Sequence, residues 1–323
     1  MIGNRILVTG GAGFIGSNLV DELMKQDVHV IVYDNFDEYY LGKERNLEQH
    51  ISSLDLTILR ADILDTKTLF KALDNVDIVF HLAAQPGVGF SLEDPKKTSN
   101  VNIIGTLNVL RAIKEAGVRK VIYASTSSVY GQPQYLPIDE NHPTNPVSIY
   151  GASKLAAEKY CQIFAHQLGL PMVILRYHTV YGPRQRPDMA IHKWTRALFE
   201  HKPITIYGDG NQTRDFTYID DIVDGTIRAA EVEDAVGQVF NLGGGNRISI
   251  NEVVKLLIET SEVGESRVVY EPPKVGDVSD TYADITRAKQ TLGFNPKVGL
   301  KDGLRRFIEW YKDHTKVERQ RRD

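Results

Sequence analysis

Short apolar runs alternate with amphipathic stretches through the first half of the chain, and this alternation predicts regular α/β structure. Most of the runs are continuously apolar, as expected for strands that are covered on both faces. The stretches between them have the spacing of helices that pack one face against a sheet. Alternation of this kind favours a doubly wound parallel sheet with right-handed crossovers. The expected strands are residues 5–10, 29–34, 56–62, 77–84, 120–126 and 172–177, and the expected helices are 14–26, 66–74, 99–117 and 149–168.

The pattern loosens after about residue 177, where shorter elements predict a second, smaller α/β domain. A chain of 323 residues is long enough to bury two such cores. We divide it into domains at residues 1–176 and 177–323, with 217–243 expected to return to the sheet of the first domain. The expected helices of the second part are 189–201, one that starts near 220, 249–262, 284–292 and 300–314, and the expected strands are 204–207, 214–218 and 238–243.

Composition and charge exclude several classes of function. The net charge of −4 gives no electrostatic reason to expect nucleic acid or an anionic membrane as a partner. Cys161 is the only cysteine, so an intrachain disulfide and a cysteine-based zinc site are excluded, and we expect no metal. No apolar run reaches the roughly 18 residues of a membrane helix, and the strand expected from residue 5 leaves no room for a signal peptide. We therefore expect a cytoplasmic protein.

The first stretch with recognisable chemistry is VTGGAGFIGSNLV, residues 8–20, at the end of a strand and the start of a helix. Gly10, Gly13 and Gly16 allow a tight turn at a helix N-terminus, where N–H groups stabilise a diphosphate. Asp34 closes the next expected strand, where its carboxylate accepts hydrogen bonds from a ribose and repels a 2′-phosphate. A glycine-rich helix cap beside a strand-end aspartate is the alternative, but the combination favours a Rossmann fold that binds NAD rather than NADP.

A second motif, SIYGASK at residues 148–154, places Tyr150 and Lys154 four residues apart on one helical face. It follows ASTSSVYG, residues 124–131, at a strand end. Together with the glycine motif, these stretches resemble the extended short-chain dehydrogenase/reductase family, in particular the nucleotide-sugar epimerases of its NAD-dependent epimerase/dehydratase group. The resemblance covers nearly the whole chain. It implies that Tyr150 is the general base, that Lys154 lowers its pKa and binds the nicotinamide ribose, and that Thr126 assists.

The chemistry of the tyrosine supports this implication. A free phenol has a pKa of about 10, so a tyrosine that acts as a base near neutral pH needs positive charge close by. Lys154 and an oxidised nicotinamide would provide that charge. Asp62, after the third expected strand, is a candidate adenine contact, and the small residues at 82–84 are expected where the cofactor crosses the sheet. The expected cofactor residues are Gly10, Gly13, Phe14, Ile15, Gly16, Asp34, Asn35, Asp62, Ile63, Leu82, Ala83, Ala84, Lys154 and His178.

The residues that follow Thr126 separate the reactions of this family. Dehydratases that resemble this chain carry Asp-Glu there, and nucleotide-sugar decarboxylases carry a glutamate just before Val-Tyr-Gly. This chain has Ser127 and Ser128, so the acid that protonates a leaving hydroxyl or assists decarboxylation is absent. Epimerisation at C4 remains, in which hydride leaves C4 for NAD, the 4-keto sugar turns over, and hydride returns to the other face.

A loop with three arginines, RYHTVYGPRQRPDMA at residues 176–190, indicates an anionic substrate. It resembles the corresponding segment of UDP-glucuronate 4-epimerases. The resemblance implies that Arg186 holds the sugar carboxylate together with the hydroxyl groups of Thr179, Ser127 and Ser128.

Other residues receive structural or nucleotide-binding roles. We expect Arg176 and Arg184 to support the strand end, and His178 to pack near the nicotinamide rather than act in acid–base chemistry. GDGNQTRDFTYIDD, residues 208–221, resembles the diphosphate-binding stretch of UDP-sugar epimerases. Gly89 stands where many relatives have arginine and receives no role. The implied diphosphate residues are Arg214 and Lys274, the latter in place of the family's usual arginine, and the implied uridine residues are Asp188, Met189, Thr205 and Tyr207.

The leading interpretation is a UDP-glucuronate 4-epimerase that uses NAD and forms UDP-galacturonate. The nearest alternative is a UDP-glucose or UDP-N-acetylglucosamine 4-epimerase. A more distant one is a non-catalytic NAD-sensing regulator, although such relatives typically lose the tyrosine or the lysine that this chain keeps. The expected helices at 99–117 and 149–168 resemble the pair that forms a four-helix dimer interface in the family, which implies a homodimer.

Overall fold

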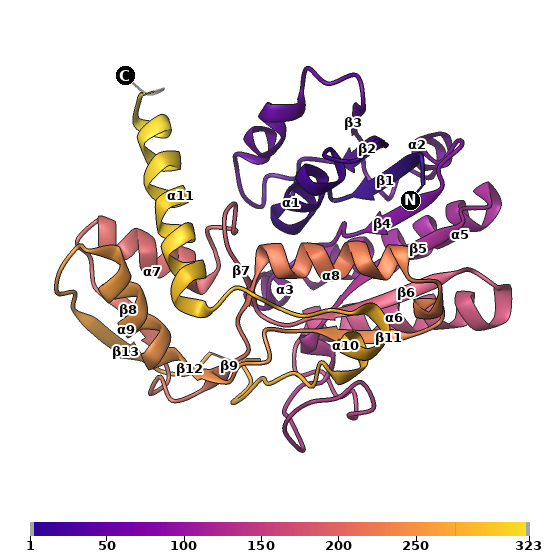
Figure 1. Cartoon of the computed structure of the whole chain (residues 1–323). Coiled ribbons are helices and arrows are strands. Elements are labelled where there is room, and N and C mark those ends of the chain that lie inside the picture. The colour runs from indigo at the N-terminus through magenta and orange to yellow at the C-terminus, as the bar shows by residue number, and fades with distance from the viewer. Residues whose placement is uncertain (1–2, 275, 321–323) are drawn as a thin grey trace.

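A seven-stranded parallel sheet forms the centre of the computed structural model, which describes residues 3–274 and 276–320 (Figure 1). Its strands are β1 (Arg5–Thr9), β2 (His29–Asp34), β3 (Leu56–Arg60), β4 (Ile78–His81), β5 (Lys120–Thr126), β6 (Met172–Tyr177) and β11 (Val239–Leu242). They lie in the order β11-β6-β5-β4-β1-β2-β3. The chain therefore runs outward from β1 to β3, crosses back, and runs outward again from β4 to β11. This is the Rossmann order that the sequence predicts.

Helices cover both faces of the sheet, because successive strand residues point to opposite sides. The helices on one face are α1 (Phe14–Leu23) and α8 (Ile219–Glu231), and those on the other face are α2 (Thr66–Ala72), α5 (Thr106–Ala116) and α6 (Ile149–Leu168). Ile6 and Val8 of β1 belong to the apolar core on the α1 side. Leu7, between them, belongs to the core on the α5 side. Burial on both faces explains why these strands are continuously apolar.

A second lobe, which contains α11 and stands at the left of Figure 1, joins the first through a continuous apolar core. Its elements are β7 (Val180–Tyr181), α7 (Ala190–Phe199), β8 (Ile204–Tyr207), β9 (Thr213–Arg214), β10 (Thr217–Tyr218), β12 (Ile248–Ser249), α9 (Ile250–Ser261), β13 (Val268–Glu271) and α11 (Leu300–Gln320). Trp194, Leu257 and Phe307 belong to the same buried cluster as one face of the main sheet. Strands β8 and β13 pair in parallel beside α7 and α9.

The chain returns to the main sheet after β10. Helix α8 contacts β5 and β6, and β11 pairs with β6 so that Phe240 lies opposite Leu175. Helix α10 (Thr286–Leu292) then packs on β11. The two parts of the sequence are therefore interleaved in space, and the boundary after residue 176 stays an interpretation of the sequence.

Two helices differ most from their expected extents, and several short elements were not expected. The remaining short elements are η1 (Lys43–His50), α3 (Val88–Glu93), α4 (Pro95–Ser99), the π-helix η2 (Asn100–Gly105), η3 (Ser127–Val129) and η4 (Glu233–Ala235). The helix expected at 99–117 begins in α4, passes through η2 and continues as α5. The buried amide of Asn102 in this π-helical stretch bonds to the backbone of Gln85 and to the Ser153 hydroxyl. The last helix continues past residue 314 to Gln320. Within the described ranges, no helix is long and apolar enough to cross a membrane.

The single strand expected at 214–218 is two separate strands, β9 and β10. Asp215 lies between them with its carboxylate fully buried. It accepts hydrogen bonds from the backbone N–H groups of Gly244 (2.7 Å) and Ala283 (2.9 Å). This inward turn interrupts the strand, so the apolar pattern alone did not reveal the break.

Candidate active site

The glycine-rich turn lies at the carboxyl edge of the sheet, between β1 and α1. Gly10 has a φ of +71°, and a side chain there would meet the backbone nitrogen of Ala83 at 2.8 Å. A side chain on Gly16 would collide with the backbone of Gly10. Gly13 caps α1 without a side-chain hydrogen bond, so no side chain competes for the first N–H groups of the helix. The turn fits a dinucleotide diphosphate, because it presents N–H groups and the positive end of the helix dipole.

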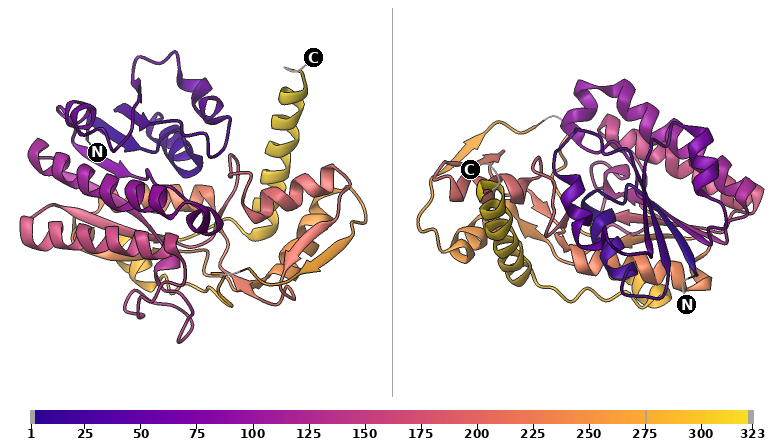
Figure 2. Two further views of the ribbon diagram at one scale, coloured as in Figure 1. Left: turned by 180° about the vertical axis from the view of Figure 1, so that it is seen from behind. Right: turned by 90° about the horizontal axis from the view of Figure 1, so that it is seen from above.

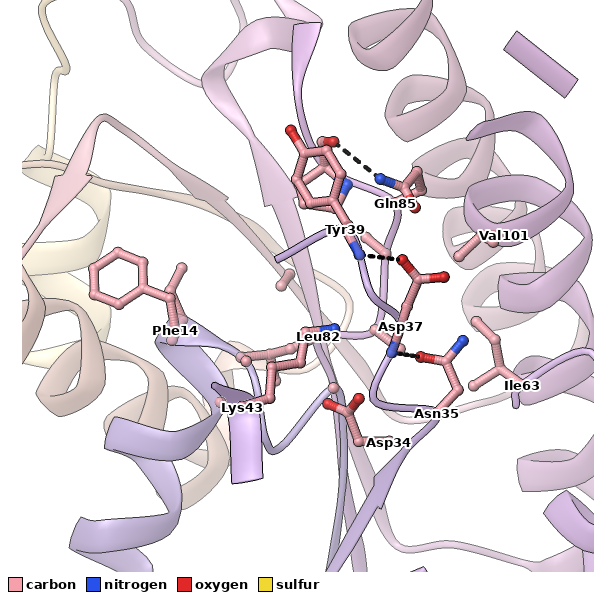
Figure 3. A pocket seen from close by; sticks show the side chains of 18 of the residues that line it. Phe14, Asp34, Asn35, Asp37, Tyr39, Lys43, Ile63, Leu82, Gln85 and Val101 are labelled. Atoms are coloured by element: carbon pink, nitrogen blue, oxygen red, sulfur yellow. Dashed lines mark hydrogen bonds between the residues drawn. The ribbon is translucent and has the colours of Figure 1, made fainter. Parts of the chain in front are cut away.

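A cavity of about 190 Å³ opens beside this turn (Figure 3). Every residue that the sequence assigns to the cofactor lines the cavity, except His178. Tyr150 and Arg186, which the sequence assigns to the substrate, also lie in its wall. The expected substrate residues outside the lining are Thr126, Ser127, Ser128, Thr179, Asp188, Met189, Thr205, Tyr207, Arg214 and Lys274.

Asp34 ends β2 and buries its carboxylate at one end of the cavity. The carboxylate accepts hydrogen bonds from the backbone N–H groups of Ala12 (3.0 Å) and Phe36 (2.8 Å). Burial raises the pKa of Asp34, while Lys43 and these N–H groups oppose the rise. Asp34 and Lys43 lie at the same end of the pocket in Figure 3. Asp34 fits a ribose, and the buried lysine, which the sequence analysis missed, offsets part of the repulsion between Asp34 and a 2′-phosphate.

Other residues of the cavity wall, most of them polar or aromatic, were not predicted from the sequence. Several belong to DNFDEYY, residues 34–40, so their position directly after Asp34 could have indicated that they line the cofactor site. Lys97 had no such signal, because it lies 60 residues from Asp37, to which it donates a hydrogen bond of 2.8 Å. The missed lining residues are Tyr33, Asp37, Tyr39, Tyr40, Lys43, Ala61, Gln85, Pro86, Lys97, Val101, Ala124, Ser125 and Tyr177.

Tyr150 lies in the first turn of α6, at the wall of the cavity. Ser148 caps this helix by accepting a hydrogen bond from the N–H of Gly151 at 3.0 Å. Burial raises the pKa of Tyr150, and two neighbours oppose the rise: the positive charge of Arg186 and a hydrogen bond with Thr126. The positive charge of Arg186 thus favours the phenolate, and the role that the motif gives to Lys154 stays a prediction.

A buried charged network lies behind the phenol. Burial lowers the pKa of Lys154 to about 8, and Glu158, one turn further along α6, opposes this effect. The Glu158 carboxylate accepts hydrogen bonds from Nη2 (2.5 Å) and Nε (3.2 Å) of Arg176 and from the Ser125 hydroxyl (2.7 Å). Arg176 therefore has the supporting position at the strand end that the sequence predicts.

The other two arginines of the arginine loop (residues 176–190) have different partners. Arg184 pairs with Asp21 of α1 at 2.8 Å. Arg186 donates to both carboxylate oxygens of Asp188, from Nε to Oδ1 at 2.9 Å and from Nη2 to Oδ2 at 3.1 Å. Of the loop's arginines, only Arg186 lines the cavity.

His178 is buried directly after β6. Its ring centroid lies 6.4 Å from that of Tyr130, and neither ring nitrogen has a hydrogen-bond partner among the residues that the structure describes. Burial lowers the pKa of His178 to about 4, so the ring is neutral near pH 7. The environment agrees with packing, and the residue lies outside the cavity lining.

Two contacts involve the expected diphosphate residues of the second lobe. Arg214 pairs with Asp277 at 2.5 Å. The Lys274 ammonium lies 3.8 Å from the ring centroid of Tyr207, so a residue implied for the diphosphate touches one implied for uridine. Of the other expected substrate residues, Ser127 and Ser128 lie in η3, Thr179 lies between β6 and β7, Met189 precedes α7, and Thr205 lies in β8.

Comparisons with known proteins identify related sequences over nearly the whole chain. A UDP-glucose epimerase of Bacillus subtilis, described as uncharacterized, is 42% identical over 95% of this chain and 97% of its own length. The UDP-glucuronate 4-epimerase of Thermodesulfobacterium geofontis is 39% identical over 96% of this chain and 97% of its own length.

A solved structure and a family model agree with these relatives. The UDP-glucuronic acid 4-epimerase of Bacillus cereus, in complex with UDP-glucuronic acid and NAD, has a TM-score of 0.91 and is 40% identical, over 96% of this chain and 99% of that chain. The model of the NAD dependent epimerase/dehydratase family matches residues 6–243. With its glycine turn and its Tyr-Lys helix on one cavity, this chain belongs to the NAD dependent epimerase/dehydratase family.

Proposed function

We propose that this NAD-dependent UDP-sugar 4-epimerase interconverts UDP-glucuronate and UDP-galacturonate. The observation that carries the proposal is the position of Arg186, whose guanidinium lies in the wall of the cavity that Tyr150 also lines. A guanidinium binds a carboxylate through two parallel hydrogen bonds, whereas the neutral hydroxymethyl group of glucose offers no charge to match it. Similarity to UDP-glucuronate 4-epimerases at about 40% identity supports the same substrate.

The reaction requires a base for the C4 hydroxyl group. The residues around the glycine turn would hold NAD, which would supply reversible hydride transfer at C4. Tyr150 removes the proton from the C4 oxygen, and the charge of Arg186 and the hydrogen bond with Thr126 favour its phenolate against the cost of burial. A positioned base of this kind contributes about 10²–10⁴-fold to the rate. Lys154 supplies a second positive charge on the same helix and holds the nicotinamide ribose.

The C5 carboxylate needs a fixed orientation during this reaction. Oxidation at C4 makes a β-keto acid, which loses CO₂ when the breaking C–C bond stands perpendicular to the carbonyl plane. Arg186 together with the hydroxyl groups of Thr179, Ser127 and Ser128 holds the carboxylate away from that orientation. The backbone N–H of Ser128 bonds to the Thr126 hydroxyl at 3.2 Å, so η3 lies next to the catalytic group.

The nucleotide is held by the second lobe in this proposal. Arg214 and Lys274 bind the diphosphate, since both carry positive charge beside β8 and β9. The uridine lies among Met189, Thr205 and Tyr207, whereas Asp188 bonds to Arg186 in the structure.

The test is product analysis after incubation of the purified protein with NAD and, in parallel, UDP-glucuronate, UDP-glucose or UDP-N-acetylglucosamine. We expect UDP-galacturonate from the first, with a kcat/KM at least about tenfold above those for the neutral sugars, because a charged hydrogen bond contributes on this scale. Turnover of the neutral sugars alone would support the alternative that the Bacillus subtilis relative's name suggests. Turnover of none would refute the epimerase activity.

We also propose a homodimer through α5 and α6. These helices contact one another and lie side by side in the view from behind (Figure 2). Tyr160 and Ile163 on α6, and Ile104 in η2, are exposed apolar side chains that a partner would cover. Light scattering should report a dimer for the wild type and a monomer for Ile163→Glu. A monomeric wild type at micromolar concentration contradicts the proposal.

A further inference from the structure

Arg186 already binds a carboxylate in this structure. Its Nε and Nη2 donate to the two oxygens of Asp188, and the two side chains are 18% and 34% exposed. This is the two-bond arrangement that the proposed function assigns to the sugar carboxylate. A sugar at the remaining edge of the guanidinium would meet a charge that Asp188 has already neutralised. The internal carboxylate and the sugar carboxylate therefore compete for one cation.

Tyr39 gives Asp188 a second partner. The Tyr39 hydroxyl donates to Oδ2 of Asp188 at 3.0 Å. The ring packs edge-on against Phe90, with 5.0 Å between centroids, and the Tyr39 N–H bonds to Asp37 at 2.9 Å. A side chain on Gly87 would meet the Tyr39 hydroxyl, so the glycine leaves room for it. Tyr39 thus holds its place independently of the arginine loop and remains available to Asp188 when Arg186 leaves.

The charges explain why the pair forms without substrate. Burial disfavours the charged guanidinium, but Asp188 outweighs it and raises the pKa of Arg186. Burial also opposes ionisation of Asp188, yet Arg186 and Tyr39 lower the pKa of this carboxyl. Each ion therefore depends on a partner, because a partly buried charge that loses its counter-ion keeps the cost of its lost hydration. A neutral sugar offers no replacement partner, whereas a carboxylated sugar does.

We propose that Asp188 is a specificity-determining residue, an internal counter-ion that occupies Arg186 until a sugar carboxylate replaces it, while Tyr39 holds the displaced side chain. The inference rests on the proposed function. Because the sugar carboxylate must displace Asp188 from Arg186, UDP-glucuronate and its epimer both bind less tightly. The product therefore leaves readily. The same pair lets a neutral sugar enter without leaving Arg186 unpaired. Asp188 thereby sets the preference between charged and neutral sugars.

The test compares the KM values for UDP-glucuronate and UDP-glucose in two variants and their combination. Asp188→Asn removes the competing charge, so we expect the KM for UDP-glucuronate to fall about tenfold and that for UDP-glucose to rise. Tyr39→Phe removes the second partner of Asp188, so the KM for UDP-glucuronate should rise about fivefold. The double variant should match Asp188→Asn, because Tyr39 acts through Asp188.

Asp21→Asn is the matched control, since it removes the carboxylate partner of Arg184 in the same loop. It should leave both KM values unchanged. If Asp188 and Tyr39 only stiffened the loop, Asp188→Asn and Tyr39→Phe would each raise the KM values for both sugars. That result overturns the inference. If Asp188 instead contacted the uridine, Asp188→Asn would weaken inhibition by UMP, and this outcome also overturns the inference. Failure of the wild type to convert UDP-glucuronate is a separate result, which refutes the proposed function itself.

Discussion

Replacing Glu158 with glutamine removes one negative charge from the interior of α6 and preserves the length of the side chain. The wild-type carboxylate accepts two hydrogen bonds from Arg176 and one from Ser125. After the change, the guanidinium keeps the Tyr130 hydroxyl (2.8 Å) and the backbone carbonyl of Glu140 (3.1 Å) as acceptors. It loses the anion that compensates its charge.

Burial sets the size of the effect. The Glu158 and Arg176 side chains are 0% and 3% exposed. Breaking such a pair by removing one partner costs about 3–5 kcal/mol, because neither water nor a counter-ion replaces the lost charge. Glu22 and Lys25 pair at the same distance of 2.5 Å, but their side chains are 46% and 67% exposed. Glu22→Gln should therefore cost less than about 1 kcal/mol.

Urea unfolding followed by circular dichroism measures both variants against the wild type. The free energy of unfolding should fall by several kcal/mol for Glu158→Gln and hardly change for Glu22→Gln. Adding Arg176→Met to Glu158→Gln should recover part of the loss, because the buried guanidinium that lost its anion is then gone. Equal losses in Glu158→Gln and Glu22→Gln would refute this expectation, since the buried pair would then cost no more to break than the exposed one.

The same substitution has a functional consequence through Lys154. Burial lowers the pKa of this lysine to about 8, and Glu158 opposes that effect. Without Glu158 the pKa falls further, so Lys154 loses its proton at a lower pH. The alkaline limb of the activity profile should move to lower pH in Glu158→Gln and stay in place in Glu22→Gln.

Four further predictions address the active site. Tyr150→Phe should fold and bind NAD yet epimerise about 10²–10⁴-fold more slowly; near-normal activity would assign the proton transfer to another group. Arg186→Ala should raise the KM for UDP-glucuronate about 10- to 100-fold and release a UDP-ketopentose together with NADH. Absence of the ketopentose would contradict the role of Arg186 in holding the carboxylate. The unfolded His178 takes up a proton below pH 6.5 and the folded one only below about 4, so His178 lowers wild-type stability by up to about 3 kcal/mol as the pH falls across that window. His178→Phe should remove this contribution in urea unfolding, and parallel pH curves for the two proteins would reject it. Titration should show that NAD binds more tightly than NADP because of Asp34, and Lys43→Met should widen the preference; equal affinities would reject the role of Asp34.

Local sequence determined the main sheet and the elements that carry its chemistry. Helix α6 has the expected bounds, 149–168, because its cap and its apolar spacing lie within one segment. Tyr150 and Lys154 share a helix, so their spacing alone places them together. Much of the second lobe was harder to predict in detail. Strands of two residues such as β9 and β10 show no periodicity, and Asp215 separates them through partners far along the chain.

Only the tertiary structure decided which charges act on one another. The sequence shows three arginines in one loop, but burial and distant partners make Arg176 a support for α6 and leave only Arg186 in the cavity wall. The structure likewise brings Tyr39 to Asp188 across 149 residues and adds the charge of Arg186 to the groups that act on Tyr150. Side-chain spacing along one helix is a local property of the backbone. Burial and ion pairing depend on segments that meet only when the whole chain has folded.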